Sequence, residues 1–268
     1  GGTVLGSTTS DDQRFVTPVT PLGGTTTTGI GFPIGFDLFF NGQVYDRVAV
    51  NTNGWLSFGN SALTPSVNNA STSSYTPLAS TSATTPTHLR SRIAAMARDL
   101  QGQAGSEMRI QTIGTTPNQV CVVQWLGMRR YGAAGESFNF QARLNEVDNT
   151  VEVVFGSMTW SATSNTCTIG LGGTTVADFN SRKTTTNWNA TTASSVVGDV
   201  CYFGTSPAVT VPVSGTSFKW TPGAIPTCFG PTALATTTVA STSASFGWGA
   251  PSTGTPPVVY NWKVVLAG

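Results

Sequence analysis

The single histidine of this chain limits the enzymatic chemistry that its residues could perform. His88 is the only histidine among 268 residues, so a Ser–His–Asp or Cys–His mechanism would have to use it. It lies in the Thr- and Pro-rich segment TTPTHLRS, and no GxSxG nucleophile motif occurs in the chain. We therefore interpret His88 as a solvated loop residue.

Paired carboxylates are the second catalytic possibility, because glycosidases place two of them roughly 5–10 Å apart. Glu146 and Glu152 lie on either side of an expected hairpin turn and could face each other across two strands. Acidic residues are otherwise sparse along the expected strands, so we interpret this pair as part of an ordinary polar face. The sequence therefore predicts a protein that is not an enzyme.

Calcium is the one metal that the acidic residues could hold. Hard cations prefer clustered oxygen ligands, and the best candidates are the adjacent Asp11 and Asp12 together with Asp99. No EF-hand or repeat spacing accompanies them, and Asp99 could instead cap a turn beside Leu100. A calcium site is thus one hypothesis for these three carboxylates, and no other cofactor is expected.

Aromatic side chains suggest a glycan ligand, because an exposed ring can stack on a sugar. Trp160 and Trp188 lie in the loop-like stretches SMTWSATSN and KTTTNWNATT, and Tyr131 is a third candidate. The alternative for both tryptophans is packing over the end of a β-sandwich. Glycans are therefore possible partners.

Four cysteines, Cys121, Cys167, Cys201 and Cys228, bear on the compartment of the protein. They show no CxxC spacing, which disfavours zinc. An even number of cysteines predicts two disulfides in an oxidising compartment, with buried free thiols as the alternative. The sequence does not choose among the possible pairings.

The composition is typical of an all-β protein outside the cell. Charged residues make up 9% of the chain and the net charge is +1, whereas roughly 25% is usual for a globular protein. Threonine, which favours strands, is abundant.

No run of Lys and Arg could follow a phosphate backbone, so nucleic acid is not an expected partner. No apolar run is long enough for a membrane helix, and no signal peptide is visible at the first residues. We expect an extracellular or cell-surface location without membrane insertion.

Two stretches show the strand pattern most clearly. Residues 31–59 contain two Asn-Gly pairs, Asn41-Gly42 and Asn53-Gly54, each between apolar runs, which is typical of tight hairpin turns. Residues 107–155 predict a four-stranded antiparallel meander, because apolar and polar residues alternate in SFNFQARLNE and VEVVFG. RIAAMARDL is interpreted as a further strand. The many strands at short spacing predict two packed antiparallel sheets, a jelly-roll-like β-sandwich.

The domain organisation follows from a shift in composition. Residues 1–222 are expected to form the β-sandwich, and 223–230 form a linker rich in proline and glycine. Residues 231–268 are expected to form a small Ig-like β module, with strand-like runs at 233–239, 243–248 and 258–266.

This last segment resembles the beginning of a fibronectin type III domain. The resemblance rests on the PTAL entry at 231–234, on Trp248 in the second run and on Tyr260 and Trp262 in the third. About 38 residues cover only part of such a domain, so a neighbouring chain could supply the strands that complete it. We expect the assembly region to include Ala233, Trp248, Tyr260 and Trp262.

The first 220 residues are similar to a β-sandwich module of secreted and cell-surface proteins of Bacteroidota. The similarity rests on GFPIGFDLFFNGQVYDRVAVNTNGWLSFG, RIAAMARDL, QVCVVQWLGMRRYG and FNFQARLNEVDNTVEVVFG. It implies cargo of a type IX secretion route, often placed ahead of fibronectin-type repeats. The expected function is that of a non-catalytic structural or adhesive building block, whose partners are further subunits or repeat domains. The alternative is a carbohydrate-binding module of a secreted hydrolase.

Overall fold

The protein is built from strands throughout, as the sequence predicts. The computed structural model describes residues 2–6, 10–18, 28–61, 67–69, 77–78, 91–161, 165–175, 177–184, 188, 191–203, 212–223, 232–240 and 242–249. Two antiparallel sheets pack as a sandwich within the compact unit Gly1–Pro222, and a two-stranded sheet lies in the second unit, Gly223–Gly268. Among these residues there is no helix of the length and apolarity needed to cross a membrane.

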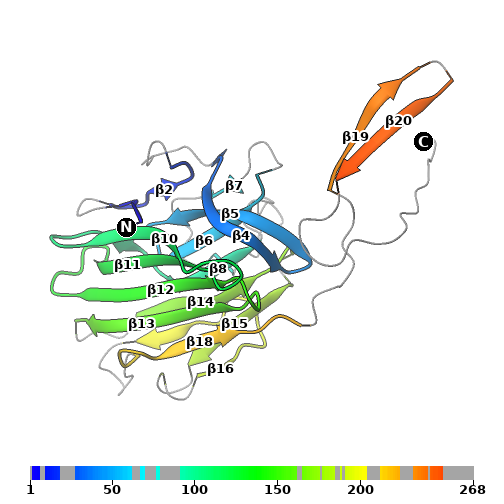
Figure 1. Cartoon of the computed structure of the whole chain (residues 1–268). Helices are drawn as coiled ribbons and strands as arrows, with labels where there is room; N and C mark the ends of the chain where they lie inside the picture. Colours follow the sequence, from blue (N-terminus) through cyan, green and yellow to red (C-terminus); the bar gives the residue numbers. More distant parts are fainter. Residues whose placement is uncertain are drawn as a thin grey trace. The chain divides into compact units, whose positions relative to one another are not determined.

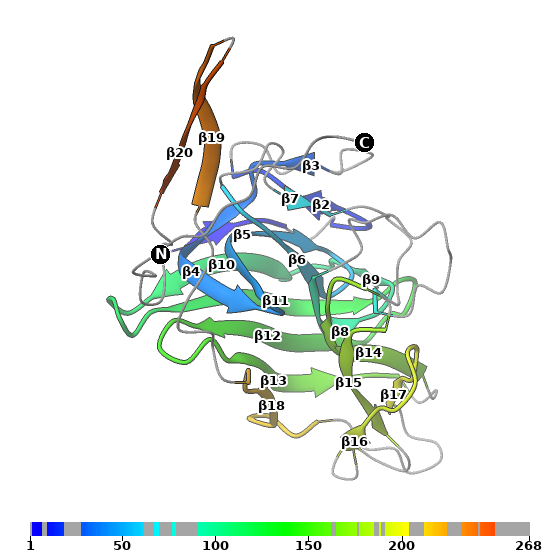
Figure 2. The same ribbon diagram turned by 90° about the vertical axis from the view of Figure 1, so that its right-hand side faces the viewer.

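The first layer of the sandwich is a seven-stranded sheet that contains the predicted meander. Its order is β1 (Thr3–Val4), β10 (Glu107–Ile113), β11 (Val120–Arg130), β12 (Ser137–Asn145), β13 (Val151–Thr159) and β18 (Ser217–Trp220), with β9 (Leu100–Gln101) paired to β11. Strands β10 to β13 lie side by side in chain order in both ribbon views (Figures 1 and 2). Alternate residues of β12 are buried, so one face of this sheet forms the core and the other is polar.

The second layer is an eleven-stranded sheet assembled from distant parts of the chain. Its main path is β16 (Thr191–Ala193), β15 (Phe179–Thr184), β14 (Asn165–Gly172), β8 (Arg92–Ala97), β6 (Trp55–Gly59), β5 (Gln43–Asn51) and β2 (Arg14–Phe15). Off this path, β17 (Cys201–Phe203) pairs with β14, β4 (Phe32–Phe40) with β5, and β7 (Val67–Asn68) with β6 and with β3 (Thr28–Gly29). Every residue of β6 and β8 is buried, so these two central strands are covered on both faces.

The core lies between the two layers and is centred on large aromatic side chains. Trp125 of the seven-stranded sheet is fully buried and stacks on Phe140, with ring centroids 5.0 Å apart. Its indole Nε1–H donates to the carbonyl oxygen of Asn51 in the other sheet at 3.0 Å. A buried indole that both packs and donates a hydrogen bond fixes one layer against the other.

The two Asn-Gly pairs form different turns. Asn41 and Gly42 both have positive φ, 47° and 77°, which is the type I′ geometry expected for the β4–β5 hairpin. In the second pair only Gly54 has positive φ, 78°. A Cβ at Gly54 would lie 2.2 Å from the carbonyl oxygen of Met96, whereas a Cβ at Gly42 would meet no atom within 4 Å.

The expectation of two disulfides is corrected by the structure. Cys121, Cys167 and Cys201 are free, buried thiols, and Cys228 lies outside the described residues. Cys121 lies in β11, in a different sheet from the other two, and burial raises its pKa to about 12. Cys167 and Cys201 are register partners in β14 and β17, and the Cys201 thiol donates to the carbonyl oxygen of Arg182 at 3.4 Å. Apolar surroundings favour the neutral thiol, so these cysteines act as small core residues.

The second unit contains a two-stranded antiparallel sheet. Strand β19 (Thr232–Val239) pairs with β20 (Ala244–Gly249), and the register shifts twice along β19. Side chains from Ala235 to Thr238 are exposed, and Trp248 is 40% exposed. The third run expected from the sequence, with Tyr260 and Trp262, lies outside the described residues.

The two turn glycines provide a matched test of the packing at the β5–β6 turn. We expect Gly42→Ala to cost about 1 kcal/mol of unfolding free energy, because an L-residue pays only for its positive φ there. Gly54→Ala should cost about 3 kcal/mol or more, because the added methyl group also overlaps the Met96 carbonyl oxygen. Chemical denaturation of both variants measures the difference, and equal losses would contradict the close approach seen at Gly54.

Candidate functional site

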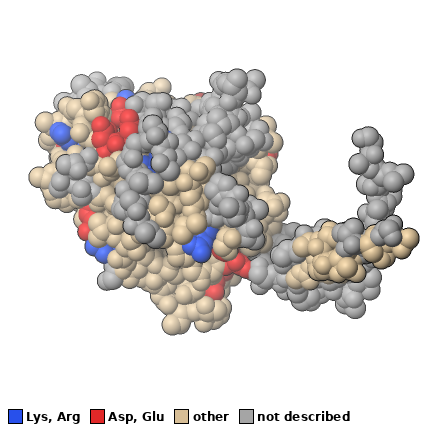
Figure 3. Space-filling model, turned by 90° about the horizontal axis from the view of Figure 1, so that it is seen from above, with Lys and Arg blue, Asp and Glu red and all other residues tan. Residues whose placement is uncertain are grey.

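The three predicted calcium ligands come together at one end of the sandwich. Asp11 and Asp12 precede β2, and Asp99 lies in the turn between β8 and β9. One carboxylate oxygen from each lies within 4.8 Å of the other two. Figure 3 shows the acidic side chains of one face in a few small groups, on a surface that carries few charges. The structure therefore brings these residues together, and calcium binding stays a prediction.

Asn53 holds two of the elements that carry these carboxylates. Its side chain is fully buried, and its Nδ2 donates to Asp12 Oδ1 at 2.8 Å. Its Oδ1 accepts the backbone N–H of Leu100, also at 2.8 Å, immediately after Asp99. Asp12 has a φ of 46°, which places its backbone in the left-handed region. Sequence reasoning assigned Asn53 only to a turn and missed this role, because its partners lie 41 and 47 residues away.

Burial and mutual repulsion both disfavour the charged form of Asp11 in this cluster. The pKa of Asp11 is raised by burial and then by the negative charges of Asp12 and Asp99. Arg14 interacts electrostatically with Asp12: burial lowers the pKa of Arg14, and the negative charge of Asp12 acts in the opposite direction. Three oxygen donors with excess negative charge are the donor set that a hard divalent cation prefers.

Tyr131, one of the predicted ligand-binding aromatics, belongs to the same end of the sandwich. Its backbone N–H donates to the carbonyl oxygen of Asp99 at 3.0 Å, and its side chain is 61% exposed. The next residue, Gly132, donates its N–H to Gln101 Oε1 at 2.6 Å, and Gln101 forms a β-bridge with Asp11. An exposed aromatic side chain is thus carried on a turn that is hydrogen-bonded to the acidic cluster.

The two tryptophan candidates face the core. Trp188 is 3% exposed and packs between Phe155, at 5.4 Å, and Phe218, at 6.2 Å. Trp160 is partly buried and packs against the core. Buried in this way, Trp188 presents little ring surface to a sugar, and sugar binding by either tryptophan stays a prediction.

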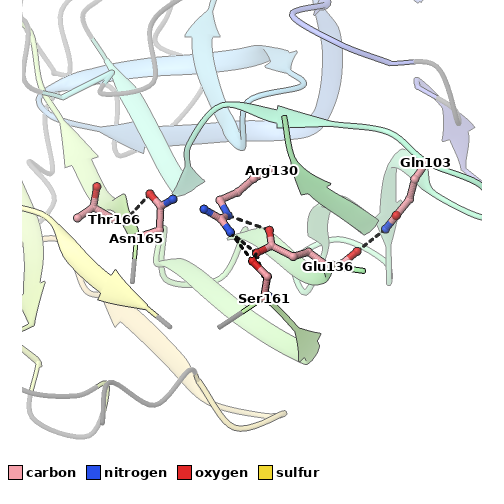
Figure 4. A network of polar contacts seen from close by, with 6 residues as sticks. All are labelled: Gln103, Arg130, Glu136, Ser161, Asn165 and Thr166. Atoms are coloured by element: carbon pink, nitrogen blue, oxygen red, sulfur yellow. Dashed lines mark hydrogen bonds and ion pairs between the residues drawn. The ribbon is translucent and has the colours of Figure 1, made fainter. Parts of the chain in front are cut away.

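A buried ion pair near the same end is fully used by the protein itself. Figure 4 shows the carboxylate of Glu136 between Arg130 and Ser161. Arg130 Nε donates to Glu136 Oε2 at 2.8 Å, its NH2 group donates to the other oxygen, and the Ser161 hydroxyl and backbone N–H both donate to Oε1. Burial acts to raise the pKa of Glu136, but these hydrogen bonds outweigh it and the pKa is lowered. Both carboxylate oxygens accept hydrogen bonds from the protein, so this network braces the turn after β11.

The acidic residues considered for glycosidase chemistry are also engaged. Glu146 accepts the backbone N–H of Gln119 at 2.9 Å, and Glu152 pairs with Arg143 at 3.9 Å across β12 and β13. His88 lies outside the described residues.

The polar outer face of the seven-stranded sheet forms a shallow hollow of about 380 Å³. Its amides are paired with one another: Gln141 Nε2 donates to Gln124 Oε1 at 2.7 Å, and Arg143 Nε donates to Gln141 Oε1 at 2.9 Å. These side chains form a hydrogen-bonded ladder across β11 and β12, which covers the outside of the sheet.

Comparison with known proteins identifies the family of the sandwich unit. A family model described as NIDO related matches residues 7–222, so the chain belongs to the NIDO-related family. Neither the curated proteins nor the solved structures contain a match. The Bacteroidota, type IX secretion and fibronectin type III resemblances remain predictions.

The pKa of Asp11, raised by burial and by the neighbouring carboxylates, gives a pH-dependent test of the acidic cluster. Because the folded-state pKa of Asp11 lies above its ordinary value of 3.8, its contribution to stability is present below that value and is lost as the pH rises through the raised pKa. In EDTA at pH 7 we therefore expect Asp11→Asn to have a higher Tm than the wild type, and the gap should close on acidification. Differential scanning calorimetry measures both effects.

Calcium chloride should reverse this order if the cluster holds the ion. We expect it to raise the Tm of the wild type and to leave Asp11→Asn nearly unchanged, because one ligand is lost. Asp37→Asn, on β4, removes the same charge elsewhere and should respond as the wild type does. A wild-type Tm that calcium leaves unchanged would show the calcium prediction to be wrong.

Proposed function

We propose that this member of the NIDO-related family is a non-catalytic extracellular protein, a structural or adhesive building block of a bacterial cell-surface or filament assembly. Its contacts would be made by strand edges and surfaces. Its partners would be further subunits or following repeat domains, without nucleic acid or membrane insertion. The resemblance to secreted Bacteroidota modules, type IX cargo and a fibronectin type III beginning supports this proposal.

One observation carries the proposal: the sheet of the second unit has two strands in the described part of the chain. β19 and β20 pair with each other, and neither pairs with any other described strand. A two-stranded sheet is marginally stable in water, and an unpaired edge is a template for another strand. Strand addition from a neighbouring subunit would supply main-chain hydrogen bonds and cover the region that includes Ala233 and Trp248.

The sandwich unit suits a scaffold role. Its central strands β6 and β8 are buried throughout, and the sheets are fixed to each other by the Trp125–Asn51 hydrogen bond. Its buried Arg130–Glu136 pair is saturated by hydrogen bonds within the protein. A body fixed in this way would hold the contacts made at its strand edges in a constant arrangement.

A lysine on the edge strand tests assembly through the small sheet. We expect the full chain to form multimers whose fraction increases with concentration, measured by size-exclusion chromatography with light scattering. Thr238→Lys places a charge on β19 and should abolish them, because edge lysines oppose strand pairing. Val147→Lys adds the same charge at an exposed turn of the sandwich and should leave the multimers intact. A soluble, intact wild type that stays monomeric at all concentrations would overturn the proposal.

A second candidate function is glycan binding, as in a carbohydrate-binding module of a secreted hydrolase. The observation that favours it is the placement of exposed Tyr131 on a turn bonded to Asp99 of the acidic cluster. Such an end could combine ring stacking with hydroxyl recognition through a cation.

A glycan array separates this function from assembly. We expect a hit that Tyr131→Ala weakens by about 1 kcal/mol or more, as the loss of a stacking contact should, and that EDTA also weakens. Tyr202→Ala removes a comparably exposed ring in β17 and should leave the hit unchanged. A flat array would remove glycan binding as a candidate.

A further inference from the structure

A second hollow, of about 360 Å³, lies between the last strand of one sheet and a strand of the other. It is lined by β18 and the following Thr221 on one side and by Asn180 and Arg182 of β15 on the other. The indole Nε1–H of Trp220 donates to Asn180 Oδ1 at 3.1 Å and joins the two walls. Both ribbon views show β15 beside β18 (Figures 1 and 2).

β18 is an edge strand in the described part of the chain. It pairs with β13 from Val151 to Val154 and is the last strand of its sheet. In an antiparallel edge strand, alternate residues direct their N–H and C=O groups away from the sheet. The hollow therefore runs beside main-chain donors and acceptors as well as side chains.

The charge of this hollow is positive. Among the described residues, its lining includes Arg182 and Lys219 and no acidic side chain. Arg182 uses its NH2 group on the carbonyl and hydroxyl oxygens of Thr191, while its buried Nε has no hydrogen-bond partner among the described residues. Lys219 is half exposed and reaches Asp148 at 3.3 Å, at the surface. The hollow thus offers two cationic groups: Arg182, which lies over Phe218, and Lys219, which lies on the outer face of the sheet opposite Glu152.

Ring stacking is not available here, which separates a peptide from a sugar as the ligand. Phe218, the ring in the wall, has Arg182 over it at 5.2 Å and Trp188 stacked on it at 6.2 Å. Trp220 is 8% exposed and uses its indole on Asn180. The features that remain for a ligand are a strand edge and two positive charges.

We propose that β18 accepts an extended acidic peptide segment, which adds to the edge of the seven-stranded sheet and places two adjacent carboxylates, one on each face, against Arg182 and Lys219. Main-chain pairing supplies affinity, and the two cations select the charge of the segment. This inference rests on the proposed function, since it names the chemistry of a partner for a scaffold that assembles through strand edges. The acidic segment belongs to another subunit or to a following domain.

The test is fluorescence anisotropy with a short capped peptide that has glutamate at adjacent positions, so that one carboxylate faces each side of the sheet. The full chain should bind it, and a peptide with glutamine in place of glutamate should bind about tenfold more weakly or worse. A peptide with the same glutamates and N-methylated backbone amides should also lose binding, because it cannot pair with a strand edge. An oligouronate is the fourth ligand, and it should bind no better than the N-methylated peptide.

Charge-neutral variants locate the site on the protein. Lys219→Gln and Arg182→Gln should each weaken the glutamate peptide by about tenfold. Lys183→Gln is the matched control, because Lys183 follows Arg182 on β15, pairs with Asp199 at 3.4 Å and does not line the hollow. Asp148→Asn removes the anion that competes for Lys219 and should tighten binding severalfold. Because this variant gains affinity, it supports the site even if Arg182→Gln folds poorly.

Three outcomes would overturn the inference: equal binding of the glutamate and glutamine peptides, unchanged affinity in Lys219→Gln, or an oligouronate that binds as tightly as the glutamate peptide. The last result would assign the hollow to free anions. If the wild type forms multimers that Thr238→Lys abolishes, but does not bind the glutamate peptide, the proposed function stands and only this inference is overturned. Peptide binding by a chain that stays strictly monomeric would leave this inference standing and overturn the proposed function.

Discussion

The alternation of apolar and polar side chains along β10 to β13 is the constraint on which the sandwich depends. A strand with this pattern is stable only when its apolar face is covered. The eleven-stranded sheet provides the cover, and the hydrogen bond from Trp125 to the Asn51 carbonyl sets the registry of the two layers. Asn51 precedes the turn in which Asn53 contacts Asp12 and Leu100, so the same contact also locates the acidic end of the molecule.

Local pattern was sufficient to predict much of the fold. Phe138, Phe140, Ala142 and Leu144 are all buried, as a period of two requires. Asn41-Gly42 forms the expected type I′ turn, because both residues reach positive φ at low cost. The strand assigned to RIAAMARDL is β8. In each case the deciding interactions lie within a few residues or between neighbouring strands, so the sequence contains them.

Long-range placement could not be predicted in the same way. Trp188 lies in a polar stretch, KTTTNWNATT, yet it is buried because Phe155 and Phe218 of the other sheet cover it. The cysteine count suggested disulfides, but Cys121 lies in a different sheet from the other two described cysteines, and all three are free thiols in the core. Asp99 was grouped with Asp11 by residue type alone, and its hydrogen bond with the turn of Tyr131 carried no signal in the sequence. The charge of the β15–β18 hollow likewise arises from two strands of different sheets.

The three buried thiols have a practical consequence for following the motions of this protein. Cys121 belongs to one layer, whereas Cys167 and Cys201 belong to the other. Burial raises the pKa of each, so a thiol-specific reagent reacts only after the surrounding strands have separated. The rates of labelling, assigned to each cysteine by peptide mapping, therefore report how often each layer opens under native conditions. These native cysteines therefore allow the local opening of each sheet to be measured separately, without an introduced label site.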